Sequence, residues 1–175
     1  MQEQRIIRTH DFNKSIKIGN DGEQTILKYL RNHPKIKKVK DVSKIAEFRD
    51  IDIDYCVEFI TGKKSTIELK TDTYTSGNIF YETMSNMECN VPGCMVKSQA
   101  EFLFYYFTKT HELYIIKFAE YKIWFEENKP HFTRKLLKNI NKQRNGKYTS
   151  EGYTIPKTFF ESNFKHFQKL ILQEE

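Results

Sequence analysis

Three charged side chains near the middle of the chain have residue types and a spacing suited to phosphodiester cleavage. Asp54 lies in the segment IDIDYCVEFI, and Glu68 and Lys70 lie in the segment STIELKTD that follows it. Two neighbouring carboxylates repel each other unless a cation lies between them, and Mg²⁺ binds carboxylates, water and phosphate oxygens. A lysine beside the ion can orient the attacking water and offset charge on the phosphate. These residues predict a metal-dependent phosphodiesterase centre.

A β-hairpin is expected to position this cluster. Within IAEFRDIDIDYCVEFI, residues 45–60, polar and apolar residues alternate from Asp50 to Phe59, and alternation returns in STIELKTD, residues 65–72. Alternation with a period of two predicts a strand in each segment. The segment Thr61–Lys64 contains a glycine, and it predicts the turn between the two strands.

The hairpin would place several acidic side chains on one face. If its turn is centred on Gly62, Asp54 lies across from Lys70 at about 5 Å and diagonal to Glu68 at about 7–8 Å. Asp52 lies on the same face and competes with Asp54 as a metal ligand. A solvated face without a site is the alternative, because alternating charge is common on the exposed side of an antiparallel sheet.

A glutamate in the first predicted helix is a further candidate. The segment Asn20-Asp21-Gly22-Glu23 has the form of a capping box and predicts a helix over about residues 21–32. Glu23 shares a helix face with Ile26, Leu27 and Leu30. A carboxylate directed toward a core needs a partner, which a metal site would provide. Glu23 therefore completes the metal shell, caps the helix, or does both.

The remaining segments predict a mixed α/β domain. The expected elements are a strand over 78–85, a helix over 98–107, a strand over 112–118, a helix over 119–129, a strand over 152–156 and a helix over 162–173. With the first helix and the hairpin, the core order becomes helix, three strands, helix, strand. We expect one domain over residues 1–175, with a core over about 20–125 and a basic extension over about 129–175.

Length and composition fit a globular protein. The chain has 175 residues, of which 38% are hydrophobic and 14% aromatic, enough for one domain with a normal core. It contains no run of eighteen apolar residues, and its first ten residues lack the apolar stretch of a secretion signal. We therefore expect a soluble, cytoplasmic protein that does not bind membranes.

The cysteines are expected to be free thiols. The chain has 3 cysteines, an odd number, which does not favour a disulfide framework. Cys89 and Cys94 form a Cys-x4-Cys pair, but structural zinc needs four ligands and no second close pair follows.

The net charge of +6 favours a polyanionic partner. Two basic stretches stand out, Lys35–Lys44 and Arg134–Lys147. Each is either a binding surface or a solvated segment.

The acidic and basic residues together resemble the PD-(D/E)XK nuclease superfamily. Its members share a core of a helix, a three-stranded meander, a second helix and a fourth strand (αβββαβ), called the restriction-endonuclease-like core. An acidic residue opens the second strand and Glu-x-Lys lies in the third. The resemblance assigns these roles to Asp54 and to Glu68-Leu69-Lys70, and it matches Glu23 to the helical glutamate of many members, including the Holliday-junction-resolvase-like ones.

A small bacterial and phage subgroup is similar over a longer stretch. In that subgroup a Gly-Asn and a later glutamate follow the Glu-x-Lys, and Gly77, Asn78 and Glu82 match them. Glu82 is thereby either a further acid near the metal or a surface residue of its strand. Two departures are the missing proline before Asp54 and the second aspartate in register, Asp52.

The resemblance implies a magnesium- or manganese-dependent DNA nuclease, an endonuclease that hydrolyses phosphodiester bonds with a metal-activated water. A homodimer is an expectation from the resemblance alone. Six basic residues become candidates for contacts to DNA phosphates: Arg134, Lys135, Lys138, Lys142, Arg144 and Lys147. The competing hypotheses are a catalytically inactive nucleic-acid- or protein-binding module on the same core, and a structural protein.

Overall fold

The computed structural model describes residues 7–8, 12–75, 77–139 and 148–173. The chain divides into two compact units, and each is built from separate segments of the sequence. Unit 1 comprises Met1–Lys17, Ser76–Lys97 and Lys122–Lys165, and unit 2 comprises Ile18–Thr75, Ser98–Tyr121 and His166–Glu175. Each unit contains one β-sheet, and the two are described in turn.

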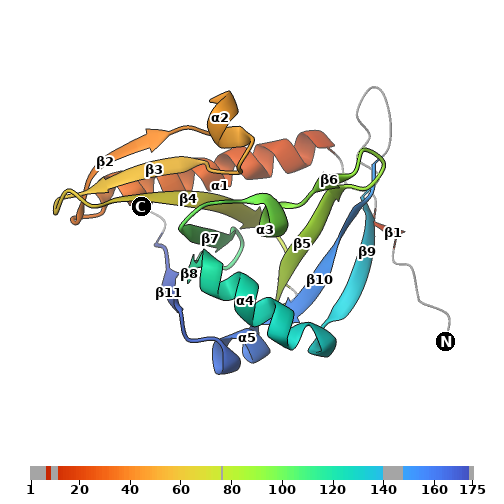
Figure 1. Cartoon of the computed structure of the whole chain (residues 1–175). Coiled ribbons are helices and arrows are strands. Elements are labelled where there is room, and N and C mark those ends of the chain that lie inside the picture. Colours follow the sequence, from red (N-terminus) through yellow and green to blue (C-terminus); the bar gives the residue numbers. More distant parts are fainter. Residues whose placement is uncertain (1–6, 9–11, 76, 140–147, 174–175) are drawn as a thin grey trace. The chain divides into compact units, whose positions relative to one another are not determined.

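Unit 2 contains a six-stranded mixed sheet (Figure 1). Its strands, in spatial order, are β11 (Phe167–Ile171), β8 (Glu112–Lys117), β7 (Phe102–Phe107), β4 (Lys64–Asp72), β3 (Tyr55–Phe59) and β2 (Ile36–Asp41). Strands β4 and β7 pair in parallel, and every other neighbouring pair in this sheet is antiparallel. The chain is therefore an α/β protein with a mixed sheet, as predicted.

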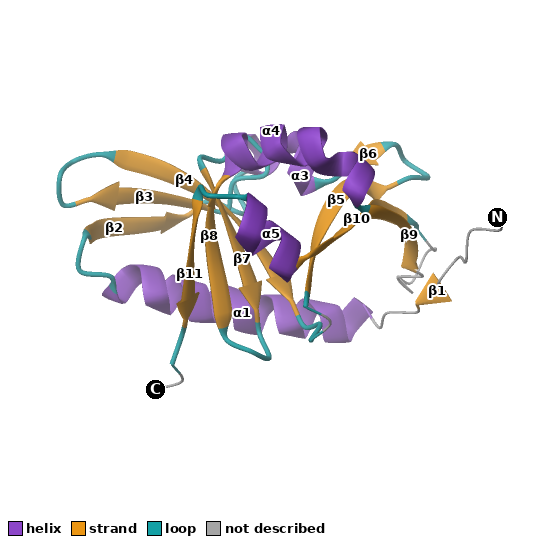
Figure 2. Cartoon of the chain, turned by 90° about the horizontal axis from the view of Figure 1, so that it is seen from below, coloured by secondary structure: helices purple, strands orange, loops and turns teal. Residues whose placement is uncertain are grey.

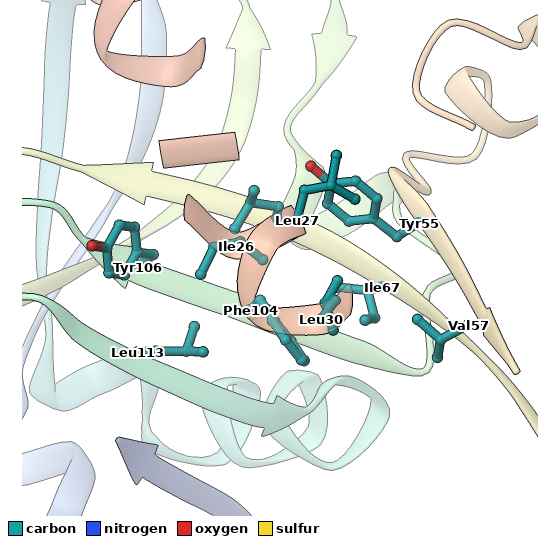
Figure 3. Close-up of a cluster of buried hydrophobic side chains, with 10 residues drawn as sticks. Ile26, Leu27, Leu30, Tyr55, Val57, Ile67, Phe104, Tyr106 and Leu113 are labelled. Carbon is teal, nitrogen blue, oxygen red and sulfur yellow. The ribbon is translucent and has the colours of Figure 1, made fainter. Parts of the chain in front are cut away.

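Helix α1 (Phe12–Asn32) covers one face of this sheet through its Ile18–Asn32 part (Figures 1 and 2). Its apolar side chains Ile26, Leu27 and Leu30 are buried against apolar residues of four strands (Figure 3). The strand residues of this cluster are Tyr55, Val57, Ile67, Leu69, Phe104, Tyr106 and Leu113. Burial of each such side chain contributes about 1.5–3 kcal/mol, so this face forms the main core of unit 2.

A glycine allows α1 to approach β4 closely. A Cβ atom added at Gly22 would lie 2.4 Å from the Cγ2 atom of Thr71 and 3.2 Å from its Cβ atom. Only a residue without a side chain fits at this contact. The start of the buried part of α1 is thereby held against the end of β4.

Unit 1 contains a five-stranded sheet (Figure 2). Its strands, in spatial order, are β1 (Ile7–Arg8), β9 (Thr133–Asn139), β10 (Ser150–Pro156), β5 (Asn78–Asn86) and β6 (Val91–Pro92). The helical elements with residues in this unit are α3 (Cys94–Lys97), the end of α4 (Phe118–Asn128), η1 (Lys129–His131) and α5 (Lys157–Asn163).

Aromatic side chains form the core of unit 1. Tyr81 stacks on Phe125 with ring centroids 3.5 Å apart. Trp124 lies within 6.1 Å, between ring centroids, of four other aromatic rings: Phe132, Phe159, Phe160 and Phe164. The high aromatic content of the sequence thus supplies large buried surfaces, as expected.

Several predicted elements are confirmed. The strands predicted over 78–85, 112–118 and 152–156 correspond to β5, β8 and β10, and the helix predicted over 119–129 corresponds to α4. Cys56, Cys89 and Cys94 are free, as predicted. Among the residues that the structure describes, no helix is both long and apolar enough to cross a membrane.

Three predicted helices need correction. Helix α1 begins at Phe12, well before Asn20, so the capping-box residues lie inside the helix and mark no start. The segment predicted as a helix over 98–107 instead contains strand β7, because the apolar run FLFYYF is buried between two neighbouring strands. The helix predicted over 162–173 is replaced by the end of α5 and by strand β11.

Candidate active site

The hairpin of β3 and β4 forms as predicted, but its register differs. Tyr55 pairs with Ile67, so the turn is centred one residue earlier than the predicted position. The ladder continues beyond β3, since the N–H of Asp54 donates to the carbonyl of Ile67 at 2.9 Å. Asp54 therefore lies across from Glu68, and Lys70 takes the diagonal position. The prediction had placed Lys70 across from Asp54 and Glu68 on the diagonal.

The strand predicted from the alternation over residues 50–59 begins later than expected. Residues 46–49 form the short helix α2 (Ala46–Arg49), and β3 begins only at Tyr55. Asp52 lies in the connection and has a φ of 45°, a left-handed conformation that aspartate tolerates better than most residues. Its carbonyl accepts a hydrogen bond of 2.7 Å from the hydroxyl of Ser98, which holds the connection in place.

Asp54 and Glu68 form a hydrogen-bonded carboxyl pair. Glu68 is only 7% exposed and donates to the carboxylate of Asp54. The Oδ2 atom of Asp54 also accepts a hydrogen bond of 2.8 Å from the N–H of Leu69. Two neighbouring carboxyl groups in a buried site cannot both ionise without a large electrostatic cost, so the pair shares a proton.

The electrostatics of the site follow from this arrangement. Burial, followed by the charges of Asp54 and Asp52, raises the pKa of Glu68 to about 9, against an opposing effect of Lys70. Burial is also the main cause that raises the pKa of Asp54 to about 6, and the charge of Glu23 adds to it. The hydrogen bond from the N–H of Leu69 acts in the opposite direction. The charges of Asp52 and Glu23 thus add to the effect of burial on the pair, and Lys70 opposes it.

Glu23 lies near the pair but is not directed into the core. Its side chain is exposed, although partial burial and the charge of Asp41 raise its pKa. Its backbone carbonyl accepts a hydrogen bond of 3.5 Å from the hydroxyl of Tyr55, the residue that follows Asp54 in the chain. The capping role is wrong because Asn20 lies inside α1. The charge of Glu23 acts on Asp54, and its role as a fourth acid of the site stays a prediction.

Lys70 is half-buried and lies on the same sheet face as Glu68, two residues further along β4. In the parallel pairing of β4 with β7, Lys70 lies beside Tyr105. The hydroxyl of Tyr105, 1% exposed, donates to the Oδ2 atom of Asp72 at 2.8 Å. Tyr105 was missed from sequence because its segment was predicted to be a helix; the buried-strand pattern FLFYYF is the signal that could have found it.

The pair has the chemistry of a partial binding site for a hard divalent cation. The hydrogen bond between the two carboxyl groups brings their oxygens together, and the raised pKa of Glu68 favours its protonated form. Over the residues that the structure describes, no group of three or more His, Cys, Asp or Glu side chains is arranged to hold a metal ion. Mg²⁺ commonly binds one or two carboxylates and takes its other ligands from water and phosphate, so two carboxylates suffice.

Some predicted residues lie elsewhere. Glu82 is half-buried on β5 of unit 1, and its predicted metal role stays a prediction. Arg134, Lys135 and Lys138 lie on β9, and their side chains are not described. Lys142, Arg144 and Lys147 lie outside the described residues.

Comparison with known proteins leaves the chain unassigned. No protein-family model matches it, and no curated protein matches it.

Proposed function

We propose that the protein is a divalent-metal-dependent DNA nuclease that hydrolyses phosphodiester bonds. The observation that carries the proposal is the pair of buried Glu68 and half-buried Asp54, with Lys70 on the same sheet face. A carboxyl pair with raised pKa values destabilises the folded state, so a contribution to folding does not explain its presence. Groups with shifted pKa values concentrate at functional sites. Paired carboxylates with an adjacent lysine suit metal-assisted phosphodiester hydrolysis.

The strand order of unit 2 supports a restriction-endonuclease-like core. Helix α1 is followed by the antiparallel meander β2, β3 and β4, and β7 then pairs with β4 in parallel. An acid precedes the second strand of this meander and Glu-x-Lys lies in the third, as in the PD-(D/E)XK pattern. One departure is that β5, β6 and α3 separate β4 from β7, where the superfamily has a helix.

Each residue has a defined role in the proposed reaction. Asp54 and Glu68 would hold Mg²⁺ or Mn²⁺, which supplies Lewis acidity toward water and phosphate. The N–H of Leu69 fixes the orientation of the Asp54 carboxylate. Lys70 would orient the nucleophile and offset negative charge on the phosphate. Glu23 and Asp52 would add negative charge at the edge of the site, which increases the affinity for a divalent ion.

A cleavage panel tests the proposal. Linear duplex DNA, single-stranded DNA, a branched junction and RNA are incubated with Mg²⁺ or Mn²⁺, and the products are separated on denaturing gels. We expect DNA cleavage by the wild type and at least a hundredfold loss, on the order of one catalytic group's contribution, in Lys70→Ala and Glu68→Gln. Lys109→Ala, an exposed lysine in the turn between β7 and β8, is the matched control and should retain full activity.

Metal binding provides a readout independent of turnover. Calorimetric titration with Mn²⁺ should detect binding by the wild type and by Lys70→Ala, and loss of binding in Asp54→Asn and Glu68→Gln. Metal binding and DNA binding without cleavage of any substrate would favour the inactive binding module. Full activity of Lys70→Ala would rule out the proposed site.

A further inference from the structure

The sheet face that carries the carboxyl pair continues across β3 and β2 as an exposed basic surface. Residues directly opposite on neighbouring antiparallel strands place their side chains on the same face. Lys38 pairs with Glu58 and Glu58 pairs with Lys64, which forms one cross-strand row. Lys40 pairs with Cys56 in the next row, nearer to the pair. We call Lys38, Lys40 and Lys64 the lysine face.

The lysine face and the carboxyl pair belong to one surface. The next residue in the alternation after Glu58 and Cys56 is Asp54, whose carbonyl accepts a hydrogen bond of 2.8 Å from the N–H of Val42. The ladder between β2 and β3 thus extends to the site. Alternate residues repeat about every 7 Å along a strand and neighbouring strands lie about 5 Å apart. The backbone of Lys40 is therefore about 9 Å from that of Asp54.

Helix α1 covers the opposite face of the sheet and leaves the lysine face to solvent. Val57 and Ile67 point to the α1 side and are buried in its core, whereas Lys38, Lys40 and Lys64 are exposed. Figure 1 shows β2, β3 and β4 side by side, with β2 at the edge of the sheet.

Glu58 lies on this face between Lys38 and Lys64 and offsets only part of its positive charge. Glu58 accepts a hydrogen bond of 2.6 Å from the Nζ atom of Lys37, a fourth lysine that is not one of the three. In the part of the chain that the structure describes, no ion pair joins an acidic side chain to any of the three lysines of the face. Glu58 also interacts electrostatically with Lys38 and Lys64, so it offsets part of the charge, and the three lysines keep a net positive charge that is available to a polyanion.

We propose that the lysine face binds the phosphate backbone of a nucleic acid and leads the strand to the carboxyl pair. This inference rests on the proposed nuclease function, because the carboxyl pair determines where the scissile phosphate would lie. Alternate lysines on a strand repeat at about 7 Å, which spans about two 3.4 Å steps of a nucleic-acid strand. Lysines on a flat strand surface bind phosphates as point charges and do not read bases, so the contact is independent of sequence.

The salt dependence of binding tests this inference. Fluorescence anisotropy measures the affinity of the full chain for labelled duplex and single-stranded DNA in EDTA, over a range of salt concentrations. The test variant is Lys38→Ala/Lys40→Ala/Lys64→Ala. The matched control removes three exposed lysines of unit 2 that lie on α1, in the β7–β8 turn and at the end of β8: Lys28→Ala/Lys109→Ala/Lys117→Ala. Circular dichroism confirms that both variants fold.

Each phosphate contact contributes about 0.9 to the slope of log affinity against log salt for duplex DNA, and about 0.7 for a single strand. We expect the magnitude of this slope to be smaller by about 2 in the test variant than in the wild type, and the affinity at low salt to be at least tenfold weaker. The control should match the wild type. Equal losses in the two variants, an unchanged slope in the test variant, or no DNA binding by the wild type would each overturn the inference.

The test separates this inference from the proposed function. DNA binding through the lysine face by a wild type that cleaves nothing with Mg²⁺ or Mn²⁺ would reject the nuclease and retain the binding surface. Metal-dependent cleavage combined with full DNA affinity of the test variant would retain the nuclease and reject the lysine face.

Discussion

Replacing Glu68 by glutamine is expected to make the metal-free protein more stable than the wild type, and this difference should grow as the pH rises. Burial and the charges of Asp54 and Asp52 raise the pKa of Glu68 from 4.5 to about 9. A carboxyl group whose pKa is higher in the folded than in the unfolded state makes its full contribution to stability below the pKa of the unfolded state. This contribution is lost as the pH rises toward the pKa of the folded state. The loss therefore accumulates between about pH 4.5 and pH 9. Glutamine is neutral at every pH and can still donate a hydrogen bond to Asp54.

The size of the effect follows from the pKa difference. Each pKa unit corresponds to about 1.4 kcal/mol, so a rise from pH 5 to pH 7.5 costs the wild type at most about 3 kcal/mol through Glu68. Asp54 competes for the same proton, which reduces the share that belongs to Glu68 alone. We expect the free energy of unfolding of Glu68→Gln to gain about 1–3 kcal/mol on the wild type over this interval.

Urea unfolding in EDTA at pH 5 and pH 7.5 measures this difference. Glu58→Gln is the matched control, because a hydrogen bond from Lys37 lowers the pKa of Glu58 and its removal gives no gain at the higher pH. Added Mn²⁺ should stabilise the wild type and leave Glu68→Gln unchanged, since a ligand stabilises only the state that binds it. A pH-independent difference, or a less stable variant at pH 7.5, would refute the shared-proton account.

Three further predictions concern packing and hydrogen bonding in unit 2. Leu30→Ala removes a core side chain that is 1% exposed, and urea unfolding should show a loss of about 2–5 kcal/mol. Gly22→Ala places a Cβ atom against Thr71 and should lower the melting temperature through a loss of about 1–3 kcal/mol. Adding Thr71→Ser to this variant removes the Cγ2 atom of Thr71 and should restore part of the lost stability. No recovery would contradict the close contact. Tyr105→Phe removes the hydrogen bond to Asp72, so calorimetry should show a loss of about 1–2 kcal/mol, and an unchanged stability would mean that the bond contributes nothing.

Local patterns predicted the parts of the fold in which neighbouring segments pair. The hairpin of β3 and β4 follows from alternation and a short turn, and the face shared by Glu68 and Lys70 follows from the period of two. The register could not be derived in this way. A turn displaced by one residue moves every cross-strand pair by two, and the exact turn depends on backbone geometry that composition does not define.

Misleading local signals account for the errors in the site region. Ile51 and Ile53 continue the alternation of β3, yet they lie in an irregular connection whose conformation depends on the distant Ser98. The sequence Asn20-x-x-Glu23 has the form of a cap, but α1 begins at Phe12 and continues through it. In the connection before β3, the deciding contact is tertiary and lies outside any local window.

The sheet partners of β5 and β7 were also beyond local reasoning. Segment 78–85 was predicted as a third strand after the hairpin, whereas β5 pairs with β10 and β6 in the sheet of unit 1. The strand beside β4 is β7, which arrives after an excursion of the chain through the other unit. Such non-local pairings depend on which surfaces can be buried together, and a single sequence does not reveal them.

The interleaving of the two units has a consequence for the order in which the protein folds during synthesis. The sheet of unit 2 is complete only after β11 pairs with β8, which brings Phe167 beside Ile116, and the whole 122–165 segment of unit 1 emerges from the ribosome between them. Pairing between distant segments is slow because loop closure costs entropy before any contact forms. Until then the β8 edge has unpaired backbone groups that can pair with other chains. No single cut in the chain separates the two units, because each is built from more than one segment.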